Sequence, residues 1–146
     1  LPYTILRPSA LYGERCISRR VSQIFVENAL NNAEIKIQGD GNEKLDFTYI
    51  EDLVGGIVNV LESKNSVNEI FNITYGQSRS INTLLEILKQ EFKNVKVTYE
   101  KRDKLMPMRG TLSTEKAIKL IGYSSKWPLE RGYPKYINWY KKVFKT

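Results

Sequence analysis

Residues 39–52 read GDGNEKLDFTYIED, and this stretch joins a strand-like segment to a helix-like one. Residues 35–38 alternate between apolar and polar side chains, which predicts a strand that stops at the glycine-rich turn 39–41. Residues 45–49 resume an extended pattern, so the turn is interpreted as that of a hairpin, although two glycines also allow a ligand to approach closely. The apolar residues that follow recur at helical spacing: Leu53, Val54, Ile57, Val58 and Leu61.

The rest of the chain continues this alternation of strand and helix patterns. Strands are predicted over residues 1–8, 70–74 and 95–99, and helices over residues 21–32, 81–92, 113–121 and 129–144. Ser80 and Ser113 are the expected N-caps and Gly122 an expected helix end, while Pro134 either starts the last helix or kinks it. The alternation predicts an α/β fold in a single domain over residues 1–146. Because a strand at residues 1–8 needs neighbours, we interpret the chain as one lobe of a larger molecule.

Composition narrows the possible chemistry. The sequence has no histidine, which excludes imidazole metal sites and histidine-based triads, so acid–base chemistry must use Asp, Glu, Lys or Tyr. Cys16 is the sole cysteine, so no internal disulfide can form and a cytoplasmic location is expected. No apolar run is long enough to cross a bilayer, and no cationic start precedes an apolar run. We therefore expect no membrane partner and no secretory signal.

The formal net charge of +7 suits an anionic partner such as nucleic acid, a membrane surface or a phosphorylated small molecule. A lysine-rich, solvated surface is the simpler explanation. The last helix interleaves four lysines with aromatic residues, a pattern that can bind single-stranded nucleic acid by stacking. The aromatic residues share a face with Ile137 and Val143, which favours a role in the core. The lysines are Lys135, Lys141, Lys142 and Lys145, and the aromatic residues are Tyr136, Trp139 and Tyr140.

Three further segments carry candidate binding residues. Residues 6–13 form a loop just beyond the end of a predicted strand, where open α/β sheets bind ligands, unless the loop is only a connector. Asp46 and Asp52 could form a carboxylate pair for glycoside chemistry, but helix capping or hydrogen bonding is the favoured interpretation. Arg109 lies between an irregular segment and a helix, where it is either a bidentate phosphate ligand or a solvated surface residue.

Together these segments resemble the C-terminal half of the NAD-dependent epimerase/dehydratase family, the extended short-chain dehydrogenases that modify nucleotide sugars. The matching motifs follow one another in the family's order and cover essentially the whole chain. They are residues 1–8 with Tyr12-Gly13, residues 35–41, Asp46-Phe47-x-Tyr49-Ile50-x-Asp52, Phe71-Asn72-Ile73, residues 109–117, and Gly122-Tyr123 with residues 129–132.

The resemblance implies the substrate-binding lobe of an extended Rossmann-type enzyme, with mixed helices and short strands and without the Rossmann half. The strand at residues 1–8 would belong to the edge of the missing sheet. The implied cofactor is NAD or NADP in the full-length protein, not retained by this chain alone, with Pro8 and Tyr12 near the nicotinamide. The implied partners are a nucleotide-diphosphate sugar and the missing half, with homodimer formation also open. Gln38 and the Gly39 backbone are expected near the base, and Asn72 and Arg109 near the diphosphate.

The sequence also departs from the family in ways that leave alternatives open. The family's glycine-rich loop and its catalytic Tyr-x-x-x-Lys are absent, so no catalytic residue is assigned and the chain alone is expected to be inactive. Ala10 stands where the family commonly has Asn, and Leu45 where it commonly has a diphosphate-binding Arg. Lys44 would project from the opposite face of a strand. The alternatives are a basic nucleic-acid-binding module and a non-catalytic family member that acts as an interaction protein.

Overall fold

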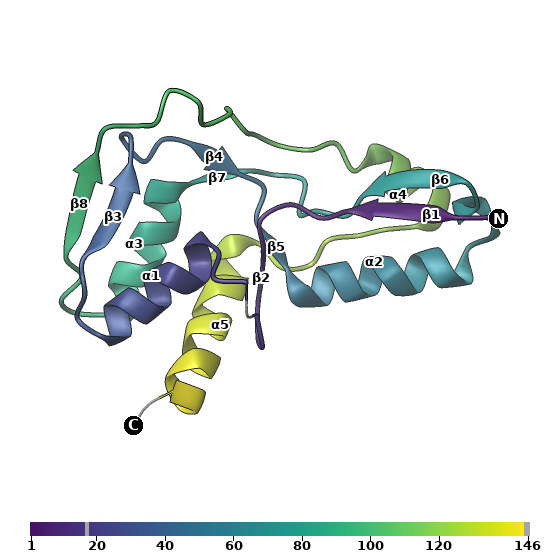
Figure 1. Cartoon of the computed structure of the whole chain (residues 1–146). Coiled ribbons are helices and arrows are strands. Elements are labelled where there is room, and N and C mark those ends of the chain that lie inside the picture. The colour runs from purple at the N-terminus through teal and green to yellow at the C-terminus, as the bar shows by residue number, and fades with distance from the viewer. Residues whose placement is uncertain (17, 145–146) are drawn as a thin grey trace.

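The computed structural model describes residues 1–16 and 18–144, so Lys145 lies outside the described residues. Helices and short strands alternate along the chain, which confirms the α/β prediction (Figure 1). The helices are α1 (Val21–Leu30), α2 (Ile50–Glu62), the 3₁₀ helix η1 (Lys64–Ser66), α3 (Ile81–Glu91), α4 (Glu115–Ile121) and α5 (Leu129–Phe144). The strands are β1 (Thr4–Arg7), β2 (Leu11–Tyr12), β3 (Ile35–Gln38), β4 (Lys44–Leu45), β5 (Thr48–Tyr49), β6 (Glu69–Asn72), β7 (Arg79–Ser80) and β8 (Val97–Glu100).

The strands pair across long stretches of sequence. β1 pairs with β6, β2 with β5 and β3 with β8, all in parallel, while β4 pairs antiparallel with β7. The predicted hairpin between residues 35–38 and 45–49 is therefore wrong. At the end of β3 the N–H of Gly39 donates to the carbonyl of Glu100 at 2.8 Å, and the chain then continues past the start of α3 instead of turning back.

The molecule has two hydrophobic cores, one at each end. The larger core lies among α1, α3, α5 and the β3–β8 pair, and the smaller one lies between β6 and α4 (Figure 1). Gly56 lets α2 approach the smaller core, since a Cβ there would lie 3.3 Å from Ile73 Cδ1 and from Tyr123 Cε2. Short strands and the segment between β8 and α4 connect the two ends.

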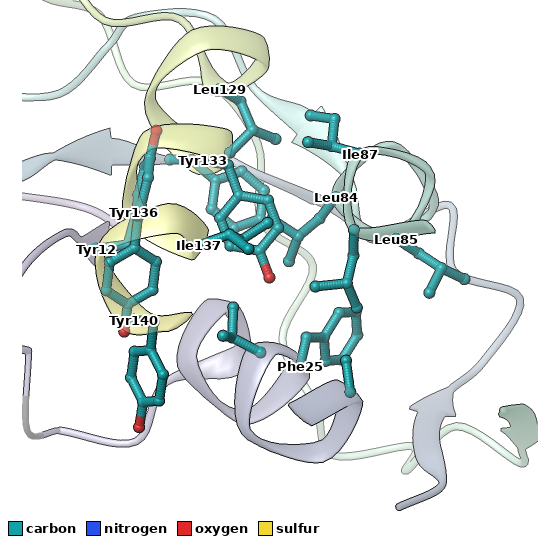
Figure 2. Packing of buried hydrophobic residues seen from close by; sticks show 14 of the residues in the cluster. Tyr12, Phe25, Leu84, Leu85, Ile87, Leu129, Tyr133, Tyr136, Ile137 and Tyr140 are labelled. Atoms are coloured by element: carbon teal, nitrogen blue, oxygen red, sulfur yellow. The ribbon is translucent and has the colours of Figure 1, made fainter. Parts of the chain in front are cut away.

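The aromatic residues of α5 belong to the larger core. Tyr133, Tyr136 and Ile137 are fully buried. Figure 2 shows Tyr133 and Ile137 on the side of α5 toward α1 and α3 and Tyr136 beside Tyr12, and the Tyr133 hydroxyl donates to the carbonyl of Ser22 at 2.9 Å. The prediction that these aromatic residues pack in the core is confirmed. Pro134 lies inside α5, which begins five residues earlier at Leu129, so the helix does not start at the proline.

The structure confirms two of the three helix caps predicted from the sequence. The Ser80 side chain accepts the N–H of Thr83 at 3.0 Å, and Gly122 ends α4 with a φ of 64°, as predicted. The N-cap of α4 is Thr114 rather than Ser113, and its side chain accepts no capping hydrogen bond. Ser113 Oγ instead accepts the N–H of Glu115 at 3.4 Å.

Apolar side chains of the described chain are exposed on α2 and on the β1–β6 pair. The predicted apolar stripe of α2 exists, but Val54 is 50% exposed and Leu61 78% exposed. Exposed Tyr3, Ile5 and Ile70 of the β1–β6 region add to it. We call this set, together with Ile57 and Val58, the apolar face. No helix among the described residues is long and apolar enough to cross a membrane.

Candidate functional site

The turn after β3 is built on two glycines. Gly39 has a φ of 83° and Gly41 a φ of 75°, values that favour glycine because it lacks a Cβ. The carboxylate of Asp40 accepts the N–H of Asn42 at 2.9 Å, and the hydrogen bonds from Asn42 hold the pKa of Asp40 below its usual range. The N–H of Asn82, in the first turn of α3, donates to the carbonyl of Gly41 at 3.0 Å. The turn is therefore hydrogen-bonded to the first turn of α3.

The pairing of β3 with β8 brings a second segment to this turn. Arg102 lies two residues after the end of β8, and its side chain lies over Gly39, where a Cβ would be 3.5 Å away. Its guanidinium Nη2 donates to the carbonyl of Met106 at 2.9 Å and lies 3.7 Å from a carboxylate oxygen of Glu43. Its Nε is buried and has no hydrogen-bond partner within the described chain. Arg102 thus braces the loop that carries Arg109.

Two hollows adjoin at this place and share Gln38, Glu43 and Arg109. The first, which we call the apolar pocket, has a volume of about 210 Å³. Its apolar walls are Val21, Phe25, Ile37, Leu45, Ile81 and Met106. The second, which we call the charged pocket, has a volume of about 350 Å³. Its remaining walls are Gly39, Asp40, Asn42, Lys44, Arg102 and Met108.

The two hollows differ in what they can bind. The apolar pocket can take a flat, largely apolar group, and the shared Gln38 places a polar group at its wall. The charged pocket carries three cations, Lys44, Arg102 and Arg109, and two carboxylates, of which Asp40 is engaged by Asn42 and Glu43 lies 3.7 Å from the Arg102 guanidinium. Guanidinium groups suit phosphate oxygens because they donate two parallel hydrogen bonds. A ligand with a flat ring joined to phosphate groups fits both hollows at once.

The structure brings three of the predicted site residues together. Gln38, Gly39 and Arg109 all line the charged pocket. Lys44 and Leu45 project to opposite sides, as predicted: Lys44 lines the charged pocket, while Leu45 is 9% exposed and lines the apolar pocket. Leu45 therefore contributes apolar surface at the position where a cation is common in the family.

The other three predicted site residues lie elsewhere. Asn72 ends β6 opposite Arg7, lines neither pocket, and donates from Nδ2 to the carbonyl of Ser113 at 2.8 Å. Pro8 is exposed just after the end of β1. Tyr12 is 1% exposed, and its ring packs among the core aromatic residues Phe47, Tyr49, Tyr133 and Tyr136. Burial raises the pKa of the Tyr12 hydroxyl.

These positions bear on the dinucleotide cofactor that the resemblance implies. The buried Tyr12 side chain presents no surface to a ligand, so of the two residues expected near the nicotinamide only Pro8 is exposed. The residues at the end of β1 and in β2 therefore do not form a dinucleotide site by themselves. The described residues also contain no group of three His, Cys, Asp or Glu side chains that could hold a metal ion.

The two aspartates of residues 39–52 are hydrogen-bond acceptors, as favoured from the sequence. Asp52 is 4% exposed and accepts the backbone N–H groups of Lys126 at 2.8 Å and Trp127 at 3.1 Å. Burial raises its pKa. Asp46 is fully buried and accepts from Thr74, Gly76 and Leu112. Because both carboxylates are occupied inside the protein, the pair is not arranged for glycoside chemistry.

Arg102 is the pocket residue that the sequence-based prediction missed. It lies in a charged, irregular stretch, and only the pairing of β8 with β3 places it at the pocket. A signal was present, since Arg102 follows a predicted strand, and ligands collect beyond the carboxyl ends of parallel strands.

Residues 1–74 match the NAD dependent epimerase/dehydratase family, and the chain belongs to this family. A candidate UDP-glucose 4-epimerase of Methanocaldococcus jannaschii is 34% identical over the whole chain, which covers 48% of that protein. The structure of a Thermotoga maritima UDP-glucose 4-epimerase with UDP-glucose is similar at a TM-score of 0.89 and 30% identity, over 98% of this chain and 47% of that one. The chain thus spans about half the length of the relatives that it matches.

A second solved structure adds a cofactor. The Bacillus cereus UDP-glucuronic acid 4-epimerase, in complex with UDP-glucuronic acid and NAD, is similar at a TM-score of 0.90 and 28% identity. The match covers 99% of this chain and 46% of that one. Relatives of this chain therefore bind UDP-sugars, and at least one of them binds NAD.

Proposed function

We propose that this chain is the C-terminal, substrate-binding part of an NAD(P)-dependent epimerase or dehydratase that acts on a nucleotide-diphosphate sugar. The observation that carries the proposal is the meeting of Gln38, Gly39 and Arg109 around two adjoining pockets, one apolar and one cationic. The base would occupy the apolar pocket, and the diphosphate would lie in the charged pocket. The sugar would then extend out of the charged pocket.

Each pocket residue has a separate task in this proposal. Phe25, Leu45 and Met106 exclude water from the base, and the amide of Gln38 hydrogen-bonds its polar edge. Arg109 and Arg102 donate to the diphosphate oxygens, and Lys44 adds a point charge. Arg102 would compensate for the leucine at position 45. No step of the redox chemistry is assigned to this chain, whose proposed share is to bind and orient the substrate.

The apolar face supports the placement of this chain within a larger enzyme. Exposed apolar surface of this extent is characteristic of interaction sites. The two-stranded β1–β6 pair gains little stability by itself and is completed when further strands are added. We propose that a Rossmann part packs against the apolar face and extends the sheet, in a cytoplasmic protein that keeps Cys16 reduced. Binding of the dinucleotide belongs to that part, with Pro8 at its border.

Calorimetric titration of the chain with UDP and with uridine tests the proposal, because uridine lacks the diphosphate. We expect the chain to bind both, with UDP the tighter. Arg109→Ala should weaken UDP binding about tenfold, since a hydrogen bond to a charged group contributes roughly 1.5–3 kcal/mol, and should weaken uridine binding much less, because Arg109 forms only part of the apolar pocket's wall. In the whole enzyme, NAD affinity should not change.

Arg131→Ala is the matched control, because Arg131 stacks on Trp127 at 4.2 Å and lines neither pocket. It should leave UDP affinity intact. An unaltered chain that fails to bind UDP, or an Arg109→Ala variant that binds it as tightly as the Arg131→Ala variant, would contradict the proposal.

A further inference from the structure

Asp46 is a fully buried carboxylate that joins three distant segments. Its Oδ2 accepts the Thr74 hydroxyl at 2.9 Å and the Leu112 N–H at 3.2 Å, and its Oδ1 accepts the Gly76 N–H at 3.0 Å. No lysine or arginine in the described part of the chain forms an ion pair with it. Its charge is therefore held by neutral donors, and a buried carboxylate that loses them is strongly destabilised.

The segments that Asp46 joins are the two sides of the charged pocket. On one side, Asp46 directly follows β4, in which Lys44 lines the charged pocket and Leu45 lines the apolar pocket. On the other side, Leu112 lies three residues after Arg109 in the segment that runs from β8 to α4 (Figure 1). The Leu112 hydrogen bond therefore ties the segment that carries the guanidinium to the strand at the pocket wall.

The span around Arg109 has few other supports. Thr111 Oγ1 accepts the Ser78 N–H at 3.0 Å, next to the Leu112 bond, and Arg102 braces the other end at Met106. Between these supports, residues 108–110 make no hydrogen bond within the described chain. Gly110 has no neighbour within 4 Å of where its Cβ would be. The position of Arg109 therefore depends on the hydrogen bonds at Met106 on one side and at Thr111 and Leu112 on the other.

We propose that Asp46 is a positioning residue, which holds the Arg109 segment so that the guanidinium faces the charged pocket before a ligand arrives. This inference rests on the proposed function, since it concerns the site where the diphosphate binds. If the Arg109 guanidinium had to be ordered during binding, the entropy lost in ordering it would lower the affinity for the ligand. Loss of the Asp46 bond should therefore weaken the diphosphate contact and spare the contact to the base.

Asp46→Asn tests the inference with UDP and uridine as the probes. The Gly76 N–H donates to Oδ1 and the Leu112 N–H to Oδ2, and an amide has an oxygen at only one of these two positions, so one of the two N–H groups then faces an NH2 group and that tether is lost. We expect UDP affinity to fall about tenfold and uridine affinity to stay within twofold. Asp52→Asn is the matched control, because Asp52 is another buried aspartate that accepts two backbone N–H groups but lies away from both pockets.

A double-mutant cycle separates positioning from general loss of stability. If Asp46 acts through Arg109, adding Asp46→Asn to Arg109→Ala should cause no further loss of UDP affinity. Additive losses, or an equal loss in Asp52→Asn, would overturn the inference. Should Asp46→Asn fail to fold, Leu112→Pro removes the N–H donor and leaves the carboxylate with Thr74 and Gly76, and the same loss of UDP affinity is expected.

A spin label at Met108, introduced as Met108→Cys in a Cys16→Ser background, tests the positioning without a ligand. Met108 is 77% exposed, so a label there disturbs little packing. The spectrum should show a restrained label in this background and a mobile one when Asp46→Asn is added. Unchanged mobility would overturn the inference even if UDP binds, whereas increased mobility in a chain that fails to bind UDP would count against the proposed function alone.

Discussion

The hydroxyl oxygen of Tyr12 fills the space beside Gly132 in which a side chain at position 132 would have to lie. A Cβ at Gly132 would also be 3.2 Å from Tyr12 Cζ and 3.4 Å from Tyr49 Cδ2. The Tyr12 hydroxyl itself is buried without a hydrogen-bond partner among the described residues. The close approach of α5 to β2 and β5 therefore requires glycine, which has no side chain, at position 132 of the helix.

Gly132→Ala should destabilise the protein, because the buried aromatic residues around Tyr12 leave its ring no room to move. Overpacking of this kind costs roughly 1–3 kcal/mol, more than alanine gains in a helix. Urea unfolding measures the difference. Tyr12→Phe is the companion variant, because it removes the unpaired hydroxyl oxygen. Alone it should be neutral or stabilising, and in the Gly132→Ala protein it should restore part of the lost free energy of unfolding. A fully stable Gly132→Ala protein would contradict this packing.

Ala10→Gly should stabilise the protein, because Ala10 adopts a left-handed φ of 38°. That conformation costs a non-glycine residue roughly 1–2 kcal/mol, and the greater freedom of glycine in the unfolded chain offsets part of the gain. We expect a net gain of about 0.5–1 kcal/mol in the free energy of unfolding, and a smaller gain for Ala10→Asn. Ala29→Gly, in the last turn of α1, should have the opposite sign, because Ala29 has helical backbone geometry.

The hydrogen bond from Tyr140 to Glu27, at 2.8 Å, should make stability depend on pH. Partial burial raises the pKa of Glu27, but hydrogen bonds from Tyr140 and Gln23 outweigh it and leave the pKa below its ordinary value. A lowered carboxyl pKa stabilises the fold above the unfolded-state value, and that stability is lost as the pH falls through the folded-state pKa.

Tyr140→Phe should therefore lower the free energy of unfolding by about 0.5–1.5 kcal/mol at pH 7 and by less in acid. Urea unfolding of both proteins between pH 7 and pH 3 measures the gap. Tyr99→Phe serves for comparison, since the Tyr99 hydroxyl donates to the neutral amide of Asn82 and its loss should not vary with pH in this range. A constant gap for Tyr140→Phe would show that Glu27 is not involved.

The apolar face should make the isolated chain self-associate at high concentration. Sedimentation velocity over a range of concentrations measures this. Val58→Glu with Leu61→Lys should reduce association without affecting folding, because Val58 is 43% and Leu61 78% exposed. Val143→Glu makes a similar change on α5, away from the apolar face, and should not reduce it. Equal effects of the two changes would mean that association occurs elsewhere.

Much of the secondary structure could be predicted because hydrophobic periodicity is a local property. The stripe of α3 and the alternation of β3 identified both elements, and glycine marked the end of α4. Strand pairing could not be predicted, because local periodicity does not specify a partner: β3 pairs with the distant β8 rather than with the nearby residues 45–49. The stripe of α2 predicted a helix correctly but could not show that its apolar residues would lie exposed.

The candidate site could be predicted in part, and chiefly from the family resemblance. Gln38, Gly39 and Arg109 come together because β3 ends where the segment after β8 passes. Arg102 was missed for the same reason that the pairing was missed. Tyr12 and Asn72 match family motifs, but motif spacing does not reveal that one side chain lies in the core and the other holds the Ser113 carbonyl.

The parallel pairing of distant strands also has a consequence for folding kinetics. Thr4 pairs with Glu69 and Ile35 with Val97, so each of these pairs closes a loop of more than 60 residues. Loop-closure entropy must be overcome before such contacts contribute, which raises the contact order and slows folding. The chain should therefore fold more slowly than a helical bundle of equal length, and its strand edges stay unpaired for longer. Unpaired strand edges and exposed apolar surface make folding intermediates prone to aggregate, so we expect molecular chaperones to raise the yield of folded chain.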